Sequence, residues 1–214
     1  TASATNKTFN FIGSGPYAST QRQKSAVRIW KELDAKVVQT DVQVPNDGLY
    51  VVSSRATKLA DGNWHYEYSV FNMNSDRSGG SFMVPVADGL AVTNLGFRDV
   101  EYSSGDGVST TGASYTNYKS DDWTSTQAGG GLTWACTPYA SDQGANAIRW
   151  HTAYNFRFDT VAQPSFIQSN VTLGLFKPGA PGDPASMMAN SVVPAVPGSA
   201  DEIFAYLDVW FTHS

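Results

Sequence analysis

The chain has 214 residues and a net charge of −5; 41% of its residues are hydrophobic and 13% aromatic, but only 15% are charged. An ordinary domain is about a quarter charged, so this composition is typical of a β-protein facing the extracellular medium rather than of a helical cytosolic enzyme. No cluster of Lys and Arg exceeds two adjacent residues, which excludes the basic patch that nucleic acid requires. No apolar run reaches the roughly 18 residues of a membrane-spanning helix.

Two local features bear on the compartment. The first residues, "TASATNKTF", lack an initiator Met, so we expect either that a leader was removed before Thr1 or that the chain was trimmed. Cys136 is the single cysteine, so no intrachain disulfide can form. We expect Cys136 to pack as a small buried hydrophobic side chain rather than to act as a nucleophile.

One short helix is predicted near the N-terminus, over 19–34 ("STQRQKSAVRIWKELD"). Thr20 and Gln23 have the spacing of a capping box. The apolar residues of this segment recur at helical spacing, and they are Ala26, Val27, Trp30 and Leu33.

The rest of the chain predicts strands separated by Gly, Ser, Asn and Asp turns. The Asp-Gly pair of "DGN" lies between two alternating runs and predicts a hairpin. About ten strands make an all-β, two-sheet β-sandwich the expected fold, with 1–214 as a single domain. The predicted strands cover 7–13, 36–44, 48–57, 64–73, 80–86, 90–102, 131–137, 146–159, 170–176 and 202–211.

Two segments are predicted to be irregular. Residues 103–122 have no sustained period and predict a long surface loop, while 177–200 contain five prolines and predict an extended segment poor in ladder hydrogen bonds. The segment 202–211 that follows is apolar on both faces, which suits a strand covered on both sides. The cover comes either from its own sandwich or from that of a neighbouring copy. In the second case its apolar residues form our candidate assembly strand: Ile203, Phe204, Tyr206, Leu207, Val209, Trp210 and Phe211.

The most regular stretch is "NAIRWHTAYNFRFD" (146–159). If it is one strand, alternate residues point to opposite faces. We then expect a core face with Trp150, Tyr154, Phe156 and Phe158, and a solvated, non-catalytic face with Arg149, His151, Arg157 and Asp159.

Candidate chemistry is sparse. His65 and Glu67 lie two apart on one strand face, but three His in the chain make a zinc site improbable, and we expect no metal or cofactor. The stretch "NMNSDRSGG" (72–80) resembles the start of a calcium loop, but Pro85 stands where a bidentate Glu is needed, so a turn is expected. Asp99 and Glu101 on one predicted strand face could together hydrolyse a glycoside.

Surface recognition of sugars is an open alternative. The aromatic side chains Tyr115, Tyr118 and Trp123, in and beside the predicted loop, could stack on sugar rings or be anchored inward. Asn6 and Asn170 each begin an N-glycosylation acceptor pattern.

Several stretches together resemble a domain of predicted secreted proteins from planctomycete-type bacteria. They are "STQRQKSAVRIWKELDAKVVQTDVQVPNDG", "NWHYEYSVFNMNSDRSGGSFMVPV", "GFRDVEYSSGDG" and "NAIRWHTAYNFRFD…VTLGLFKPG", and they span roughly 19–178. The resemblance implies export, a bacterial surface or extracellular setting and a β-rich fold. It assigns no activity and no site residues.

These observations leave three functional hypotheses. The first is an extracellular structural or surface-assembly protein, for example a subunit of a head-to-tail filament or surface layer. Its partners would be further copies of the same chain. The second is a secreted module that binds cell-surface glycans. The third is a hydrolase that acts on polysaccharide through Asp99, Glu101 or Glu67.

Overall fold

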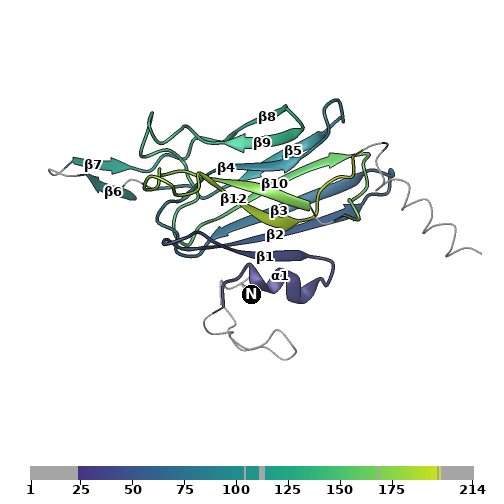
Figure 1. The fold of residues 1–214 in the computed structure, drawn as a ribbon, viewed down its shortest axis with the longest axis horizontal. Coiled ribbons are helices and arrows are strands. Elements are labelled where there is room, and N and C mark those ends of the chain that lie inside the picture. The colour runs from purple at the N-terminus through teal and green to yellow at the C-terminus, as the bar shows by residue number, and fades with distance from the viewer. Residues whose placement is uncertain (1–23, 104, 111–113, 168, 197, 199–214) are drawn as a thin grey trace, which may run out of the picture.

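The computed structural model describes residues 24–103, 105–110, 114–167, 169–196 and 198. In this part of the chain, two antiparallel sheets of five strands each face one another across a common core (Figure 1). The expected all-β, two-sheet sandwich is therefore confirmed, together with one short helix near the N-terminus.

The first sheet has the strand order β1-β2-β3-β10-β5. Its strands are β1 (Val38–Gln43), β2 (Leu49–Lys58), β3 (Trp64–Asn72), β10 (Ala153–Thr160) and β5 (Thr93–Arg98). The predicted hairpin joins β2 to β3, with Lys58 opposite Trp64. Gly62 has a φ of +92° in the connecting turn, which is a backbone conformation that glycine adopts without a steric penalty.

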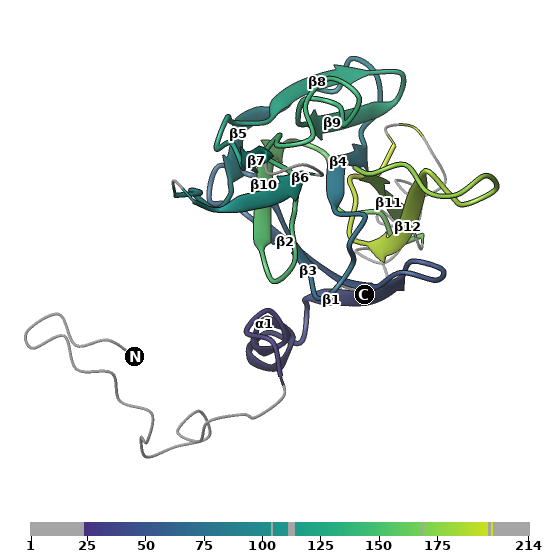
Figure 2. The ribbon, with the colours of Figure 1, turned by 90° about the vertical axis from the view of Figure 1, so that its left-hand side faces the viewer.

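The second sheet has the strand order β12-β11-β4-β9-β8. Its strands are β12 (Ser186–Ser191), β11 (Ser169–Leu175), β4 (Gly79–Pro85), β9 (Gly131–Ala135) and β8 (Thr124–Ala128). A separate hairpin of β6 (Gly107–Thr110) and β7 (Ser114–Asn117) lies at one end of the sandwich (Figures 1 and 2). Along one side, Thr40 Oγ1 of β1 donates to the carbonyl of Asn190 in β12 at 2.8 Å, which joins the two sheets.

Aromatic rings from both sheets fill the core. Phe156 is at the centre: its ring centroid lies 4.7 Å from that of Phe82 and 5.4 Å from that of Trp134, both in the second sheet. Tyr66 and Phe158 stack at 5.1 Å on neighbouring strands of the first sheet. In β3, one of the two alternating runs of the predicted hairpin, Tyr66, Tyr68 and Val70 are fully buried.

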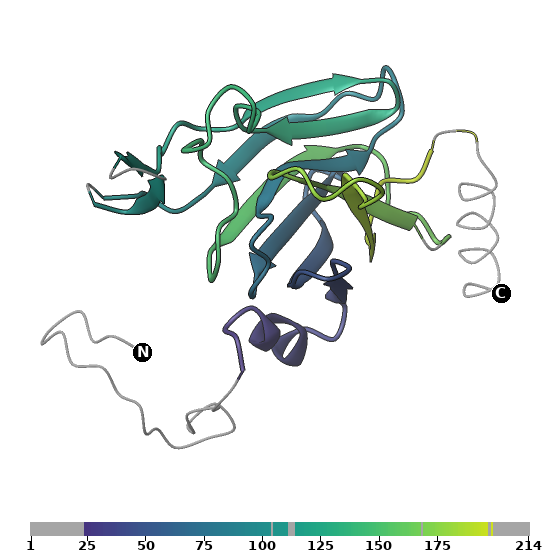
Figure 3. The ribbon, with the colours of Figure 1, turned by 60° about the vertical axis from the view of Figure 1, so that its left-hand side comes forward.

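The helix α1 (Arg28–Leu33) lies outside the sandwich beside β1 (Figures 2 and 3). None of its residues is buried, and Leu33 is 54% exposed, so the predicted apolar face does not enter the core. Polar contacts attach the helix and the turn after it instead: Arg28 pairs with Asp41 of β1, and Arg55 of β2 pairs with Asp34 at 2.7 Å. Thr20 and Gln23, the predicted capping box, lie outside the described residues.

Four strands differ from the sequence-based prediction. The segment 103–122 is not only a loop, because it contains β6 and β7. The proline-rich segment 177–200 was expected to be poor in ladder hydrogen bonds, but β12 within it pairs with β11 over six positions. Strand β8 was not predicted at all. The predicted strands 7–13 and 202–211 lie outside the described residues.

Candidate functional site

The turn that precedes β10 reverses the expected orientation of two side chains. Trp150, predicted to be in the core, is 58% exposed, while Arg149, predicted to be solvated, is only 6% exposed. Both predictions were wrong because the strand begins at Ala153 rather than at 146. Tyr154, Phe156 and Phe158 are fully buried, as expected.

His151 explains this reversal. Its φ of +58° is in the left-handed region, which a strand cannot contain, so the two-residue alternation is interrupted there. The backbone N–H of His151 donates to the carbonyl of Asn72 at 2.8 Å, and that of Thr152 donates to the carbonyl of Arg149 at 3.1 Å. These bonds fix the turn against the end of β3, and His151 itself is exposed, as predicted.

The Arg149 guanidinium is held between two aromatic rings. Its Cζ atom lies 4.3 Å from the centroid of Tyr118 and 4.7 Å from that of Phe176, which are cation–π distances. Nη2 donates to the carbonyls of Gln143 at 2.9 Å and Ala145 at 2.8 Å. Within the described residues, Nε has no hydrogen-bond partner and no carboxylate forms a salt bridge with this guanidinium. In the part of the chain that the structure describes, rings and carbonyl oxygens thus hold the guanidinium rather than a salt bridge.

A cavity of about 430 Å³ opens beside this turn. The carbonyl-anchored Tyr102, whose hydroxyl donates to Ala147 O at 3.3 Å, forms one part of its wall. Lys177 and Asp76 form an ion pair of 2.8 Å at the cavity. Asp106 accepts a 2.8 Å hydrogen bond from the backbone N–H of Ser103. The lining residues are Asp76, Ser78, Val100, Tyr102, Asp106, Gly107, Tyr118, Arg149, Trp150, Thr152 and Lys177.

The turn between β3 and β4 forms one wall of the cavity, through Asp76 and Ser78. The buried Asn72 donates through Nδ2 to the carbonyls of Ser75 and Ile148, both at 2.9 Å, and accepts from the backbone N–H of Ser75 at 2.7 Å. Residues 72–80 therefore form a turn between strands, as expected. Among the described residues there is no group of His, Cys, Asp and Glu side chains suited to a metal ion.

The three aromatic residues considered for sugar stacking have different positions. Tyr118 lines the cavity. Trp123 is 5% exposed and donates through Nε1 to the carbonyl of Asn146, so it is anchored inward as part of the core. Tyr115 belongs to β7, but its side chain lies outside the described part of the structure. Trp150, which was predicted to lie in the core, is instead the exposed aromatic side chain at the cavity.

The acidic residues considered for hydrolysis do not form a pair on one strand. Strand β5 ends at Arg98, so Asp99 and Glu101 follow it in irregular backbone. Asp99 accepts a hydrogen bond from Asn146 Nδ2, while Glu101 is exposed. The expectation that both carboxylates share a strand face was wrong, because the strand is shorter than its sequence pattern.

A second polar group lies on the outer face of the first sheet. His65 Nδ1 is 2.5 Å from Asp159 Oδ1 on the neighbouring strand, and its Nε2 is 3.9 Å from Glu67 Oε2. Asp159 also accepts from Asn94 Nδ2 at 3.1 Å. These contacts tie β3, β10 and β5 together, and none of the four residues lines the cavity. Asp159 was expected to be exposed but is largely covered by these partners, with a side-chain exposure of 14%.

Cys136 was expected to be buried; it is half-buried and packs against the edge of the core. Burial raises the pKa of its thiol to about 11. The Sγ atom donates to the carbonyl of Gly80 at 3.4 Å. Asn170, one of the two acceptor-pattern asparagines, is exposed on β11; Asn6 lies outside the described residues.

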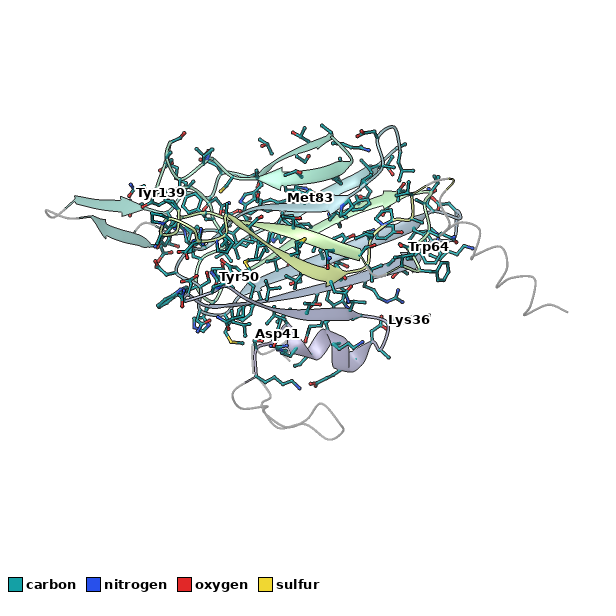
Figure 4. The ribbon with its side chains drawn as sticks, viewed as in Figure 1. Lys36, Asp41, Tyr50, Trp64, Met83 and Tyr139 are labelled. Carbon is teal, nitrogen blue, oxygen red and sulfur yellow. The ribbon has the colours of Figure 1, made fainter. Side chains whose placement is uncertain are left out.

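Apolar side chains gather at the opposite end of the sandwich. The connection from β10 to β11 lies beside the segment after β12, since Ser165 N donates to Val193 O and Ala195 N to Gln163 O, both at 2.8 Å. Four exposed apolar residues lie on these two paired segments, and we call them together the apolar end patch: Val161, Phe166, Ile167 and Val196, exposed by 70%, 63%, 56% and 54%. Trp64, opposite the last residue of β10, marks this end in Figure 4, and Tyr50 marks the cavity end.

Comparison with protein-family models, with curated proteins and with solved structures finds no match. No helix in the described residues is long and apolar enough to cross a membrane.

Proposed function

We propose that the protein is an extracellular structural component that assembles head to tail with copies of itself. The single observation that carries this proposal is the apolar end patch. Isolated apolar residues are common on protein surfaces, but neighbouring exposed apolar residues mark sites of association.

The proposed occupant of the patch is segment 202–211 of a neighbouring copy. This segment is apolar on both faces, and only six residues separate Val196, in the patch, from Ile203. Burying its side chains removes apolar surface from water at roughly 25 cal/mol per Å², which favours association.

Sheet edges suited to strand addition are also present. Within the described part of the chain, β5 pairs only with β10 and β8 pairs only with β9. An incoming strand could use the outer edge of either one for main-chain hydrogen bonds. Donor segment and acceptor surface differ, so each contact leaves one of each unused, and the contacts propagate unless they close a ring.

An extracellular setting is supported by composition and by the resemblance described above. The low charge content is typical of β-proteins outside the cell. The resemblance of roughly 19–178 to a secreted bacterial domain implies export.

The test compares two variants with the intact chain by size-exclusion chromatography with light scattering. One variant lacks 201–214, and the other carries Phe166→Ser with Val161→Ser. We expect the intact chain to form concentration-dependent oligomers and both variants to be monomeric. Leu33→Ser is the matched control, because Leu33 is also exposed, at 54%, but lies on α1 rather than in the patch or on β5 or β8.

A monomeric intact chain at high concentration contradicts the proposal. If the intact chain is monomeric and both variants lose stability, segment 202–211 covers the patch of its own chain instead.

A further inference from the structure

We propose that the cavity between the β3–β4 turn, the segment before β6 and the turn before β10 binds a sugar residue of a polysaccharide. This inference is independent of self-association, because the cavity and the apolar end patch lie at opposite ends of the sandwich.

Trp150 supplies an exposed aromatic face at the cavity. Its exposure of 58% is not a consequence of a loose loop, since the flanking residues are fixed by the left-handed backbone of His151 and by its hydrogen bond to Asn72. An indole that is more than half exposed on a fixed turn leaves apolar surface in contact with water, which is unfavourable. Recognition of an apolar ligand surface accounts for that cost.

Arg149 supplies a hydrogen-bond donor whose direction is fixed. The rings of Tyr118 and Phe176 and the carbonyls of Gln143 and Ala145 fix its guanidinium. Since Nη2 makes both of these hydrogen bonds and Nε is buried, Nη1 is the nitrogen that remains for a ligand. Little conformational entropy is lost when a group fixed in this way binds a ligand.

Acceptors and a second donor complete the lining. Asp106 and Asp76 offer carboxylate oxygens, and Lys177 offers an ammonium group already placed by Asp76. Two positive and two negative side chains thus line the cavity, which favours a ligand with many hydroxyl groups and little net charge over a phosphorylated one.

A sugar ring fits this combination. One of its faces carries C–H groups that pack on an aromatic ring, while its hydroxyl groups both donate and accept hydrogen bonds. The cavity volume of about 430 Å³ lies within the roughly 300–1,000 Å³ of small-ligand sites. The cavity is open to solvent, so a sugar residue bound there can remain part of a longer chain.

The test is binding of the intact protein to an array of immobilised neutral and uronate-containing oligosaccharides, followed by calorimetry on each glycan that is retained. We expect at least one class to bind and Trp150→Ala to weaken that binding by about tenfold, which corresponds to about 1.4 kcal/mol. The neutral and uronate arms distinguish a neutral polysaccharide from an acidic one.

Phe166→Ala is the matched control, because it removes a comparably exposed aromatic ring at the opposite end. It should leave glycan binding unchanged, and Trp150→Ala should leave the oligomeric state and the thermal unfolding midpoint unchanged. The proposal is overturned if no oligosaccharide is retained, or if Trp150→Ala binds as tightly as the intact chain.

Discussion

At the scale of single residues, stability depends on the rings that meet between the sheets. Phe156 has no exposed surface and contacts rings on several strands, including Phe82, Phe97 and Trp134. Because Phe156 is fully buried, a smaller side chain at this position would leave a cavity that is closed to solvent. Trp150, six positions earlier, has the same aromatic chemistry but an entirely different environment.

Phe156→Ala is therefore expected to lower the free energy of unfolding by about 3–5 kcal/mol, because it creates a cavity in a close-packed core. Trp150→Ala, the matched control on the same segment, should change it by about 0.5 kcal/mol or less. Urea unfolding followed by circular dichroism measures both values. Equal losses in the two variants would contradict the assigned orientations.

The thiol of Cys136 is expected to be unreactive in the folded protein. The pKa of about 11 means that little thiolate is present at neutral or mildly alkaline pH, and the thiolate is the reactive form. Alkylation by iodoacetamide, followed by mass spectrometry, should be slow in the native protein and rise with pH toward 11, but be fast in urea. Rapid native labelling at about pH 8 would show that the thiol is not buried as described.

At the scale of elements, the turns at the cavity end depend on close backbone packing. A Cβ atom on Gly48 would lie 2.5 Å from backbone atoms of Asn74 and Ser75. In the same region Asp47 accepts hydrogen bonds from Ser75 Oγ and from the backbone N–H of Asp76 at 3.0 Å. The β1–β2 turn thus packs directly on the β3–β4 turn.

Gly48→Ala is expected to destabilise the protein by about 1–3 kcal/mol, because backbone atoms on the opposing turn must move. Asn46→Gly is the control in the same turn: Asn46 has a φ of +58°, which glycine adopts readily, so stability should be unchanged or slightly higher. Thermal unfolding of the two variants is the measurement. A fully stable Gly48→Ala variant would contradict the close approach of the two turns.

The elements also show where sequence reasoning succeeds and fails. The β2–β3 hairpin was predictable because Asp61 and Gly62 separate two long alternating runs. Strand β12 ("SMMANS") was not predictable. Prolines lie on both sides of it, and it is a strand because it pairs with β11, a tertiary contact that its local sequence does not reveal.

The cavity was even less accessible to prediction. The alternation in 146–159 continues through His151 in the sequence, although the backbone does not, and nothing in the residue types reveals a left-handed conformation there. The partners of Arg149 come from distant segments, as Tyr118 and Phe176 show. The positive φ of His151, which interrupts the alternation, can be recognised only in the structure.

At the scale of the whole molecule, buried tyrosines make stability depend on alkaline pH. Burial raises the pKa values of Tyr66, Tyr68 and Tyr154 above the usual value of 10.0. The folded state therefore holds these protons more tightly than the unfolded state does. Their contribution to stability is fully present below about pH 10 and is lost progressively as the pH rises above it.

The urea concentration at the unfolding midpoint should consequently decrease as the pH is raised from about 9 to about 11.5. The absorbance of tyrosinate is recorded in the same samples. The part of this signal that comes from the buried tyrosines should appear together with unfolding and not before it. A midpoint that is constant over this range would contradict the burial of these hydroxyl groups.

The central claim about the whole molecule is directional assembly, in which segment 202–211 of one copy covers the apolar end patch of another. Sedimentation velocity of a mixture tests it most directly. The variant lacking 201–214 keeps only the patch, and the Phe166→Ser, Val161→Ser variant keeps only the segment. Each alone should sediment as a monomer, and their mixture should give a heterodimer that grows no further. A mixture that contains only monomers, with an intact chain that is also monomeric, would contradict the claim.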